Sequence, residues 1–274
     1  MDQPIVLTSV HNPQVKRVRR LHEARQRRED GLFILEGAKL LAEAQRSGWE
    51  IVALYATASW QDADAPATSP AGSDAAVLPA PVRVADHVLA AMSALETPEG
   101  VLALARLPRP SGLPEIQPTS LWVACDRLQD PGNLGTILRT ADAAGASAVL
   151  VGPGTTDAFG PKVTRASMGS SLHLPIVPFT DLVALRRATQ AGGMRWAAAV
   201  PRSGQALYDA DLTGPLCWWI GNEARGLSPD LLALADLQLE IPMPGRAESL
   251  NAASAAAVCL FETVRQRRAA SLQA

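Results

Sequence analysis

Three loops after residue 125 combine polar side chains with the glycine and proline residues that form tight turns. The first, DRLQDPGNLGTILRTADAAGA, contains Asn133 and Arg139, and the second, GNEARGLSP, contains one carboxylate, Glu223. The third, IPMPGRAESLN, contains Ser249 and Asn251 and leads into an alanine-rich stretch. A guanidinium, amides, a hydroxyl and a carboxylate brought together can hold a substrate and stabilise developing negative charge.

Taken singly, each loop has a simpler explanation as a joint between a strand and a helix. Asn133 could cap a helix that runs through Arg139, and Ser249 or Glu248 could cap the last helix. Capping does not explain Arg139, which shares a helix face with Asp142 near the turn. Three such loops after three strands of one sheet therefore favour a shared site.

The elements that would position these loops alternate regularly after residue 120. Near-continuous apolar strands that alternate with helices predict a buried parallel sheet in an α/β domain. In such sheets ligands bind at the carboxyl ends of the strands. A long helix is expected from Ser249 to about Arg268. The expected strands are Leu121–Cys125, Ala148–Val151, Pro175–Val177, Arg195–Ala199, Leu216–Ile220 and Leu237–Ile241.

A proline-rich stretch divides the chain into two predicted domains. LPRPSGLPEIQPT, residues 107–119, predicts a stiff extended linker between a domain of residues 1–106 and a domain of residues 120–274. The first domain alternates short strands with helices and is expected to be a smaller α/β domain. Within it, residues 61–76 lack apolar periodicity and predict a flexible surface loop.

Composition excludes several classes of protein. The chain has 274 residues, 47% of them apolar, and a net charge of −2, so it is not a uniformly basic binder. The three cysteines lie in apolar contexts and predict buried thiols in a reducing compartment. The four histidines have no ligand spacing, so no metal site is expected. No signal peptide and no apolar run of about 20 residues is visible, which predicts a cytoplasmic protein without a membrane span.

A nucleotide-dependent Rossmann enzyme is the main rival from the residues alone. Gly152 and Gly154 follow a strand, but Asp157 stands where the dinucleotide fingerprint needs its third glycine. The chain contains neither a GxxxxGK[ST] phosphate loop nor a GxSxG nucleophile elbow. The rival is therefore weak.

The three loops resemble the three motifs of the SpoU (TrmH-like) branch of the SPOUT RNA methyltransferases, in the same order and with similar spacing. The resemblance covers about residues 121–268. The first domain, through HNPQVKRVRRL, FILEGAKLLAEA and TPEGVLALA, resembles the L30e-like substrate-binding domain of the same family. The residues that carry the three motifs are Asn133 and Arg139, then Gly221, Asn222, Glu223 and Gly226, then Ile241, Pro242 and Met243 with Ser249, Leu250 and Asn251.

The resemblance implies a fold that general rules would not favour. Connections in proteins almost never knot, so the physical default is an open doubly wound sheet. The family instead has a deep C-terminal trefoil knot in its α/β methyltransferase domain. The resemblance also implies a homodimer whose active site is completed across the interface between the two subunits.

The resemblance further implies S-adenosylmethionine as cofactor and transfer of its methyl group to a ribose 2′-hydroxyl of RNA. The 2′-hydroxyl also distinguishes RNA from DNA. Ribosomal RNA is favoured over transfer RNA, and a non-catalytic RNA-binding scaffold remains an alternative. The implied cofactor-binding positions are Gly152, Gly221, Ile241, Met243 and Leu250. The implied catalytic positions are Arg139, which Asn133 and Glu223 would orient, with Ser249 and Asn251.

A basic N-terminal helix would then contact the RNA backbone. Residues 11–30 contain seven basic and three acidic residues in an otherwise slightly acidic chain. The alternative is a solvated helix face without a partner. The residues expected to bind RNA are Lys16, Arg17, Arg20 and Arg27.

Overall fold

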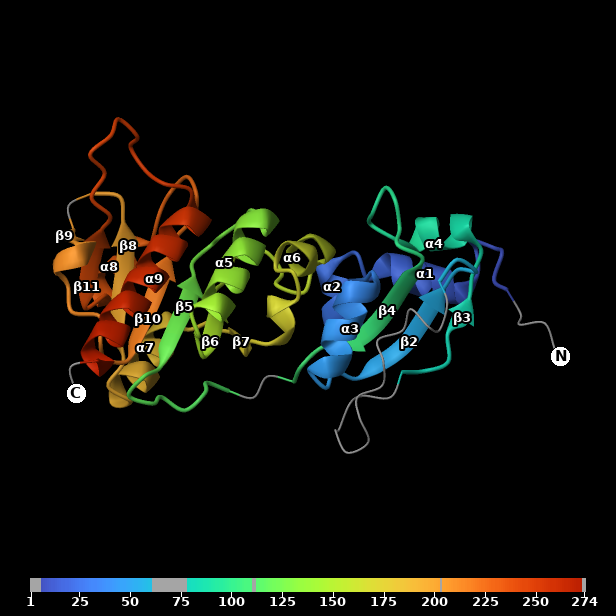
Figure 1. Ribbon diagram of the computed structural model, residues 1–274, viewed down its shortest axis with the longest axis horizontal. Helices are drawn as coiled ribbons and strands as arrows, with labels where there is room; N and C mark the ends of the chain where they lie inside the picture. Colours follow the sequence, from blue (N-terminus) through green and yellow to red (C-terminus); the bar gives the residue numbers. More distant parts are fainter. Residues whose placement is uncertain (1–5, 61–77, 110–111, 203, 273–274) are drawn as a thin grey trace. The chain divides into compact units, whose positions relative to one another are not determined.

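Two β-sheets, one in each of two units, organise the described part of the chain (Figure 1). The computed structural model describes residues 6–60, 78–109, 112–202 and 204–272. The predicted loop at 61–76 and residues 110–111 of the predicted linker lie outside these ranges. Unit 1 comprises Met1–Arg109 with Phe159–Leu172, and unit 2 comprises Pro110–Ala158 with His173–Ala274.

Unit 1 is a four-stranded sheet, ordered β1-β4-β2-β3, with helices packed against it. Strands β1 and β2 both pair antiparallel with β4, whereas β3 runs parallel to β2. The basic stretch forms two short helices rather than one, and left-handed Gly31 (φ 65°) ends the second. The elements are α1 (Pro13–Arg20), α2 (Ala24–Asp30), β1 (Leu32–Glu36), α3 (Ala38–Arg46), β2 (Ile51–Ala56), β3 (Val82–Arg83), α4 (Asp86–Met92) and β4 (Val101–Arg106).

One segment from the sequence range of the predicted second domain belongs to unit 1 in the structure. Residues 159–172, predicted in the second domain, belong to unit 1 and contain helix α6 (Pro161–Ala166) and the 3₁₀ turn η2 (Ser170–Leu172). The ring of Phe159 lies 5.1 Å from that of Phe33, and Trp49 Nε1 donates to the Leu172 carbonyl at 2.9 Å. Aromatic packing, which links residues far apart in the sequence, therefore decides the grouping.

Within the described residues, the sheet of unit 2 has seven strands, all paired in parallel, in the order β7-β6-β5-β10-β8-β11-β9. The predicted parallel sheet is thus confirmed. Strand β10 lies between β5 and β8, which brings the ends of β8, β10 and β11 side by side. The strands are β5 (Leu121–Cys125), β6 (Ala148–Val151), β7 (Ile176–Pro178), β8 (Arg195–Val200), β9 (Gln205–Ala206), β10 (Leu216–Ile220) and β11 (Leu237–Glu240).

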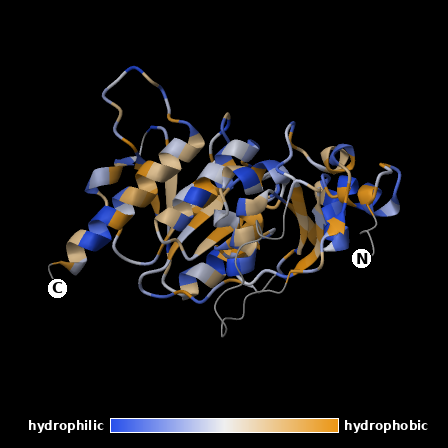
Figure 2. Cartoon of the chain, turned by 45° about the vertical axis from the view of Figure 1, so that its right-hand side comes forward, coloured by the Kyte–Doolittle hydropathy of each residue, from blue (hydrophilic) through white to orange (hydrophobic). Residues whose placement is uncertain are grey.

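Helices cover both faces of this sheet. Trp219 packs on one face with residues of α7 and α8, and Trp218 donates from the other face to Thr263 of α9 at 3.0 Å. Helix α5 lies beside α9 (Figure 1). Figure 2 shows apolar strands inside each unit and polar residues on the outer helix faces. The helices are α5 (Pro131–Ala143), α7 (Leu182–Ala191), α8 (Pro229–Leu234) and α9 (Ala252–Ser271), with the 3₁₀ turn η3 (Leu207–Asp209).

The three cysteines are buried and unbridged, as the apolar contexts predicted. Burial raises the pKa of Cys125 and of Cys259 to about 12, because a thiolate loses its hydration inside the protein. No helix among the described residues has the length and apolar character needed to cross a membrane.

Candidate active site

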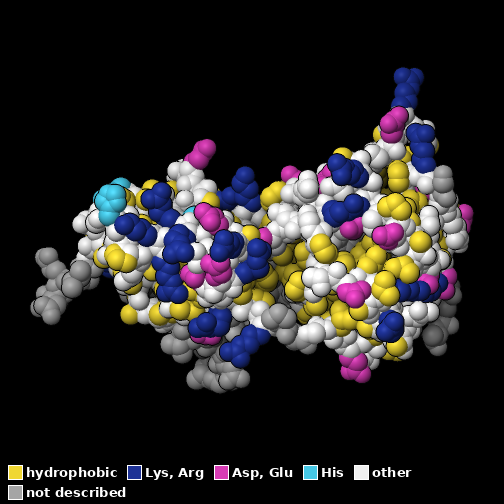
Figure 3. Space-filling model, turned by 180° about the vertical axis from the view of Figure 1, so that it is seen from behind, with side chains coloured by type: hydrophobic (Ala, Val, Ile, Leu, Met, Phe, Trp, Pro, Cys, Tyr) yellow, Lys and Arg dark blue, Asp and Glu magenta, His cyan; other side chains and the backbone are white. Residues whose placement is uncertain are grey.

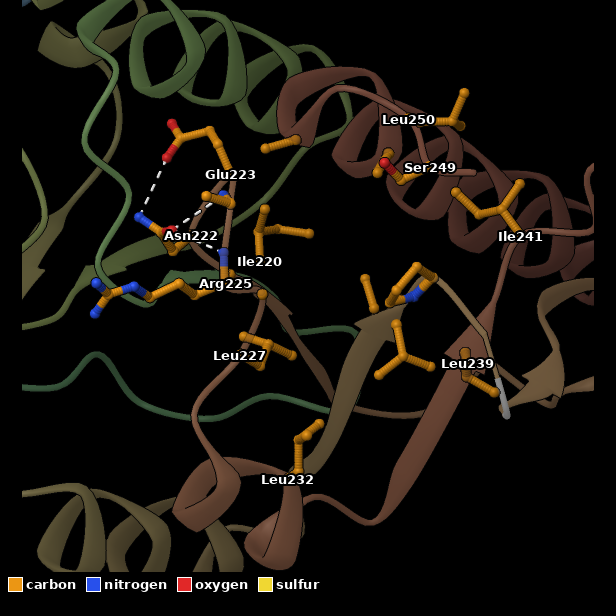
Figure 4. A pocket seen from close by; sticks show the side chains of 18 of the residues that line it. Ile220, Asn222, Glu223, Arg225, Leu227, Leu232, Leu239, Ile241, Ser249 and Leu250 are labelled. Carbon is orange, nitrogen blue, oxygen red and sulfur yellow. Dashed lines mark hydrogen bonds between the residues drawn. The ribbon is translucent and has the colours of Figure 1, made fainter. Parts of the chain in front are cut away.

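A pocket of about 380 Å³ opens at the carboxyl ends of β8, β10 and β11 (Figure 4). Apolar side chains line most of it: in Figure 4, Leu239 and Ile241 lie across the pocket from Ile220 and Leu227, and Leu232 lies at the bottom of the view. Its size and apolar walls with polar edges are typical of sites for small ligands and cofactors. The predicted residues that line it are Gly221, Glu223, Ile241, Met243, Ser249 and Leu250.

Gly152, predicted to bind the cofactor, is not among the residues that line this pocket. It follows β6, which the sheet order separates from β10 by the intervening strand β5. A Cβ at Gly152 would lie 2.7 Å from Cζ of Phe179, so close packing explains this glycine. The structure instead brings Ala199–Pro201, at the end of β8, to the pocket. The proline after that apolar strand is the signal that could have identified this loop.

The loop from Gly221 to Gly226 is a tight turn held by its own backbone and by Asn222. Asn222 and Gly226 exchange two backbone hydrogen bonds of 3.1 and 2.9 Å. Asn222 Oδ1 accepts from the backbone N–H groups of Ala224 and Arg225, both at 3.0 Å. Asn222 Nδ2 donates to the carbonyl of Arg127 at 2.9 Å, which ties the turn to the loop after β5.

Glycine at 221 is required by this turn itself. A Cβ there would lie 2.4 Å from the carbonyl carbon of Gly226 and 2.5 Å from the backbone nitrogen of Leu227. Sequence reasoning predicts that Gly221→Val blocks the cofactor while leaving the fold intact. The backbone contact contradicts the second half of that prediction, because the turn must move to admit any side chain.

Three predicted residues from three loops form one hydrogen-bonded chain. Asn251 Nδ2 donates to Asn133 Oδ1 at 2.9 Å, and Asn133 Nδ2 donates to Glu223 Oε1 at 3.0 Å. The Glu223 carboxylate also accepts from the backbone N–H groups of Asp130 at 3.1 Å and Gln129 at 3.3 Å. The side chains therefore fasten α5 to the pocket loop and to the start of α9.

The capping residues differ from those expected, and this frees Asn133 for the network. Asp130 is the N-cap of α5, and its side chain accepts from the Asn133 backbone N–H at 2.7 Å. Asn251, rather than Ser249 or Glu248, is the N-cap of α9 and accepts from the backbone N–H groups of the first turn. Asparagine and aspartate are among the strongest caps, since a short side-chain oxygen reaches those groups.

Burial disfavours the charged form of Glu223, but the hydrogen bonds from Asn133 and from backbone N–H groups outweigh it and hold the pKa below its usual value. The carboxylate is therefore ionised at neutral pH and accepts hydrogen bonds. It orders the loops rather than supplying a proton.

The lowered pKa of Glu223 predicts a pH-dependent contribution to stability. This contribution is present above the unfolded-state pKa of about 4.3 and is lost as the pH falls through the lower folded-state value. We expect Glu223→Gln to unfold at a lower temperature than the wild type at pH 6, and the difference to narrow below about pH 4. Thermal melts of both proteins between pH 3 and 7 check this. A difference that is constant over that range would contradict it.

Arg139 lies apart from this network in the single chain. It is exposed, does not line the pocket, and has no hydrogen-bond or ion-pair partner among the described residues. It follows Asn133 by six residues, which places it about 9 Å along α5 and on a face turned by about 120°. Within one chain, the hydrogen bonds of Asn133 and Glu223 go to other partners, so the expectation that they orient Arg139 stays a prediction.

The predicted RNA-binding residues of unit 1 divide into two groups. Lys16, Arg17 and Arg20 are exposed on α1, and the face in Figure 3 shows many Lys and Arg side chains gathered on this unit. Arg27 is only 3% exposed, and its Nη1 donates to the carbonyls of Leu21 (2.7 Å) and His22 (2.9 Å). It satisfies carbonyls at the end of α1 and is not available to RNA. The described residues contain no group of three or more His, Cys, Asp or Glu that could hold a metal ion.

Comparisons with known proteins identify the family of this chain. The family described as "SpoU rRNA Methylase family" matches residues 120–261, and "MRM3-like substrate binding domain" matches residues 12–103. An uncharacterized tRNA/rRNA methyltransferase of Synechocystis sp. is 37% identical over 97% of this chain and 95% of its own length. The Bacillus subtilis 23S rRNA (guanosine(2553)-2′-O)-methyltransferase RlmP is 31% identical over 93% of this chain and 97% of its own. The crystal structure of an AdoMet-bound rRNA methyltransferase from Sinorhizobium meliloti has a TM-score of 0.83 and 34% identity, covering 96% of this chain and 98% of that one.

The parallel sheet, the pocket at its carboxyl edge and the three convergent loops define a SPOUT methyltransferase. The chain belongs to the SpoU rRNA methylase family. The predicted family, fold class, enzyme class and cofactor are thereby confirmed, in place of the open doubly wound sheet and the Rossmann enzyme considered above.

Proposed function

We propose that this enzyme methylates a ribose 2′-hydroxyl of large-subunit ribosomal RNA. The pocket beside Glu223, in a chain that matches a named 23S rRNA methyltransferase over 93% of its length, is the observation that supports this most strongly. Because the proposed substrate is ribosomal RNA, we also propose a cytoplasmic location for the enzyme.

The pocket is suited to S-adenosylmethionine. We propose that the backbone of the Gly221–Gly226 turn and the side chains of Ile241, Met243 and Leu250 hold it. Bound there, it supplies a sulfonium methyl group that is already activated for transfer. Ser249 lines the same pocket and is placed to hydrogen-bond the ligand or the RNA ribose, whereas the Asn251 side chain is already engaged with Asn133 and the first turn of α9.

Arg139 has the chemistry of an electrostatic clamp. A guanidinium is a poor base at neutral pH but a good bidentate partner for phosphate. We propose that it holds the RNA phosphate next to the target and stabilises the developing alkoxide. Its exposed position on α5, where it has no partner among the residues that the structure describes, is consistent with a group that meets its partner only in the complex.

We further propose a homodimer in which Arg139 of one copy faces the pocket of the other. Two observations support it: α5 places Arg139 away from its own pocket, and α9 exposes 48% of Phe261. Mixing Arg139→Ala subunits with Gly221→Ala subunits tests it. A shared site would regenerate one intact centre in each heterodimer, so activity should return on mixing. The assay uses an S-adenosylmethionine concentration well below the raised Kd of Gly221→Ala. No gain in activity on mixing at that concentration, together with a monomer by light scattering, would exclude the shared site.

The substrate is tested by mapping 2′-O-methyl groups in RNA from a strain that lacks the gene. We expect one ribose of 23S rRNA to lose its methyl group and to regain it when purified enzyme and S-adenosylmethionine are added. Loss at a transfer RNA position instead would favour the tRNA alternative. RNA binding without any methyl transfer would favour the scaffold.

The exposed cations of α1 are expected to contact the RNA backbone. Replacing Lys16, Arg17 and Arg20 together with glutamine should reduce the log–log salt slope of RNA binding by about 2 to 3, since each phosphate contact contributes roughly 0.7–0.9. Arg106→Gln is the matched control, because Glu50 holds that guanidinium by two hydrogen bonds of 2.7 and 2.9 Å, whereas Arg17 has only a 3.8 Å ion pair with Asp30. Filter binding at several salt concentrations measures the slope. If the salt slope of RNA binding is unchanged in the triple variant, α1 presents a solvated helix face that does not contact the RNA.

A further inference from the structure

Asp142 stands one helical turn after Arg139 on α5. Residues three apart on a helix are neighbours, and opposite charges at this spacing attract each other. The carboxylate nevertheless does not pair with Arg139 in this structure. Its Oδ2 accepts from Nδ1 of His173, 2.8 Å away, just before β7. Two side chains of unit 2 thus compete for one carboxylate, and His173 holds it.

The position of Asp142 near the end of α5 means that its carboxylate is stabilised by a nearby cation or hydrogen-bond donor. A carboxylate in the last turn of a helix faces the negative end of the helix dipole, so it gains from a nearby cation or donor. The last turn of α5 contains no basic residue of its own. Asp142 therefore needs a partner, and Arg139 is the cation nearest to it on its own helix.

His173 is well placed to hold the carboxylate because its backbone is fixed. The next residue, Leu174, is 9% exposed, and the carbonyl of Pro175 accepts from the Val149 N–H of β6 at 2.9 Å. The short imidazole can therefore reach Asp142 with little loss of freedom, whereas ordering the long side chain of Arg139 costs more conformational entropy.

We propose that His173 is a positioning residue for methyl transfer: by holding Asp142 it keeps the guanidinium of Arg139 available to the RNA. This inference rests on the proposed role of Arg139. Without the imidazole, the Asp142 carboxylate turns toward Arg139 and forms an ion pair along the helix. The RNA must then break that pair before Arg139 can contact the phosphate.

The expected effect follows from the strength of such pairs. An exposed ion pair of ordinary strength would leave Arg139 free in roughly a sixth to two fifths of the molecules. His173→Ala should therefore lower kcat/KM for rRNA about two- to sixfold, with an unchanged Kd for S-adenosylmethionine. Asp142→Asn should stay near wild type, because an amide does not pair with Arg139. The double variant should match Asp142→Asn, since the competing charge is gone.

The rescue in the double variant distinguishes this role from a structural one. If His173 only supported the fold, removing Asp142 as well could not restore activity, and the double variant would stay as slow as His173→Ala. That result, or wild-type activity in His173→Ala, would overturn the inference. Arg139→Ala serves as the reference: if it retains full activity, the proposed role of Arg139 fails, whatever the other variants do. Circular dichroism and thermal melts check that each variant is folded.

Discussion

Arg139→Ala is expected to lower turnover by about 10²–10³-fold while the Kd for S-adenosylmethionine stays the same. Losing one donor that stabilises developing charge typically costs this much, because the interaction is made mainly in the transition state. Arg139 does not line the pocket, so its removal leaves the pocket walls intact. Single-turnover methylation of rRNA measures the rate, and calorimetry measures the Kd.

Arg139→Lys separates charge from geometry in the same assay. An ammonium is a point charge without the planar fork of a guanidinium, so lysine should restore only a small part of the rate. Full rescue by lysine would mean that charge alone is sufficient. An equal fall in rate and in cofactor affinity for Arg139→Ala would point to a structural role for this residue.

Gly221→Ala is expected to weaken S-adenosylmethionine binding about 10- to 100-fold, although it adds only one methyl group. The new Cβ would lie within 2.7 Å of backbone atoms of Gly226 and Leu227, which cannot rotate away as a side chain can. Overpacking of this kind typically costs about 1–3 kcal/mol, and each 1.4 kcal/mol lost from binding is about tenfold in Kd. The displaced turn also carries Glu223 away from Asn133.

Gly245→Ala is the matched control for this substitution. Gly245 lies in the loop between Met243 and Ser249, and apart from its two chain neighbours no described residue has a heavy atom within 4 Å of the position of its added Cβ. The Kd of Gly245→Ala for S-adenosylmethionine should therefore stay near that of the wild type. Similar losses in both variants would mean that loop flexibility, rather than the contact at Gly221, governs binding.

Much of this protein could be predicted from local patterns. Apolar runs such as Leu216–Ile220, alternating with helices, predicted the parallel sheet, because a strand buried on both faces must be apolar throughout. Two of the proline- and glycine-rich loops that follow these runs line the pocket, as their sequences indicated. These features depend on the order and spacing of residues along the chain, so the sequence alone contains them.

Choices between partners could not be predicted from local patterns. Asn133 and Asp130 are both good helix caps, and only the position of Glu223 shows which one is free to join the network. Arg27 looks like its exposed neighbours in sequence, but its helix turns it inward onto the carbonyls at the end of α1. A side chain that can take several partners is assigned by the distances that folding creates.

The sequence by itself determined most of the elements, the family and several residues that line the pocket, such as Glu223 and Ser249. Only the tertiary structure decided that the pocket lies at β8, β10 and β11 and excludes Gly152, since the strand order places β5 between β6 and β10. It also decided that residues 159–172 pack in unit 1 and that Arg139 stands apart from its own pocket. Strand order and side-chain partners arise from contacts between residues far apart in the chain, which local spacing does not encode.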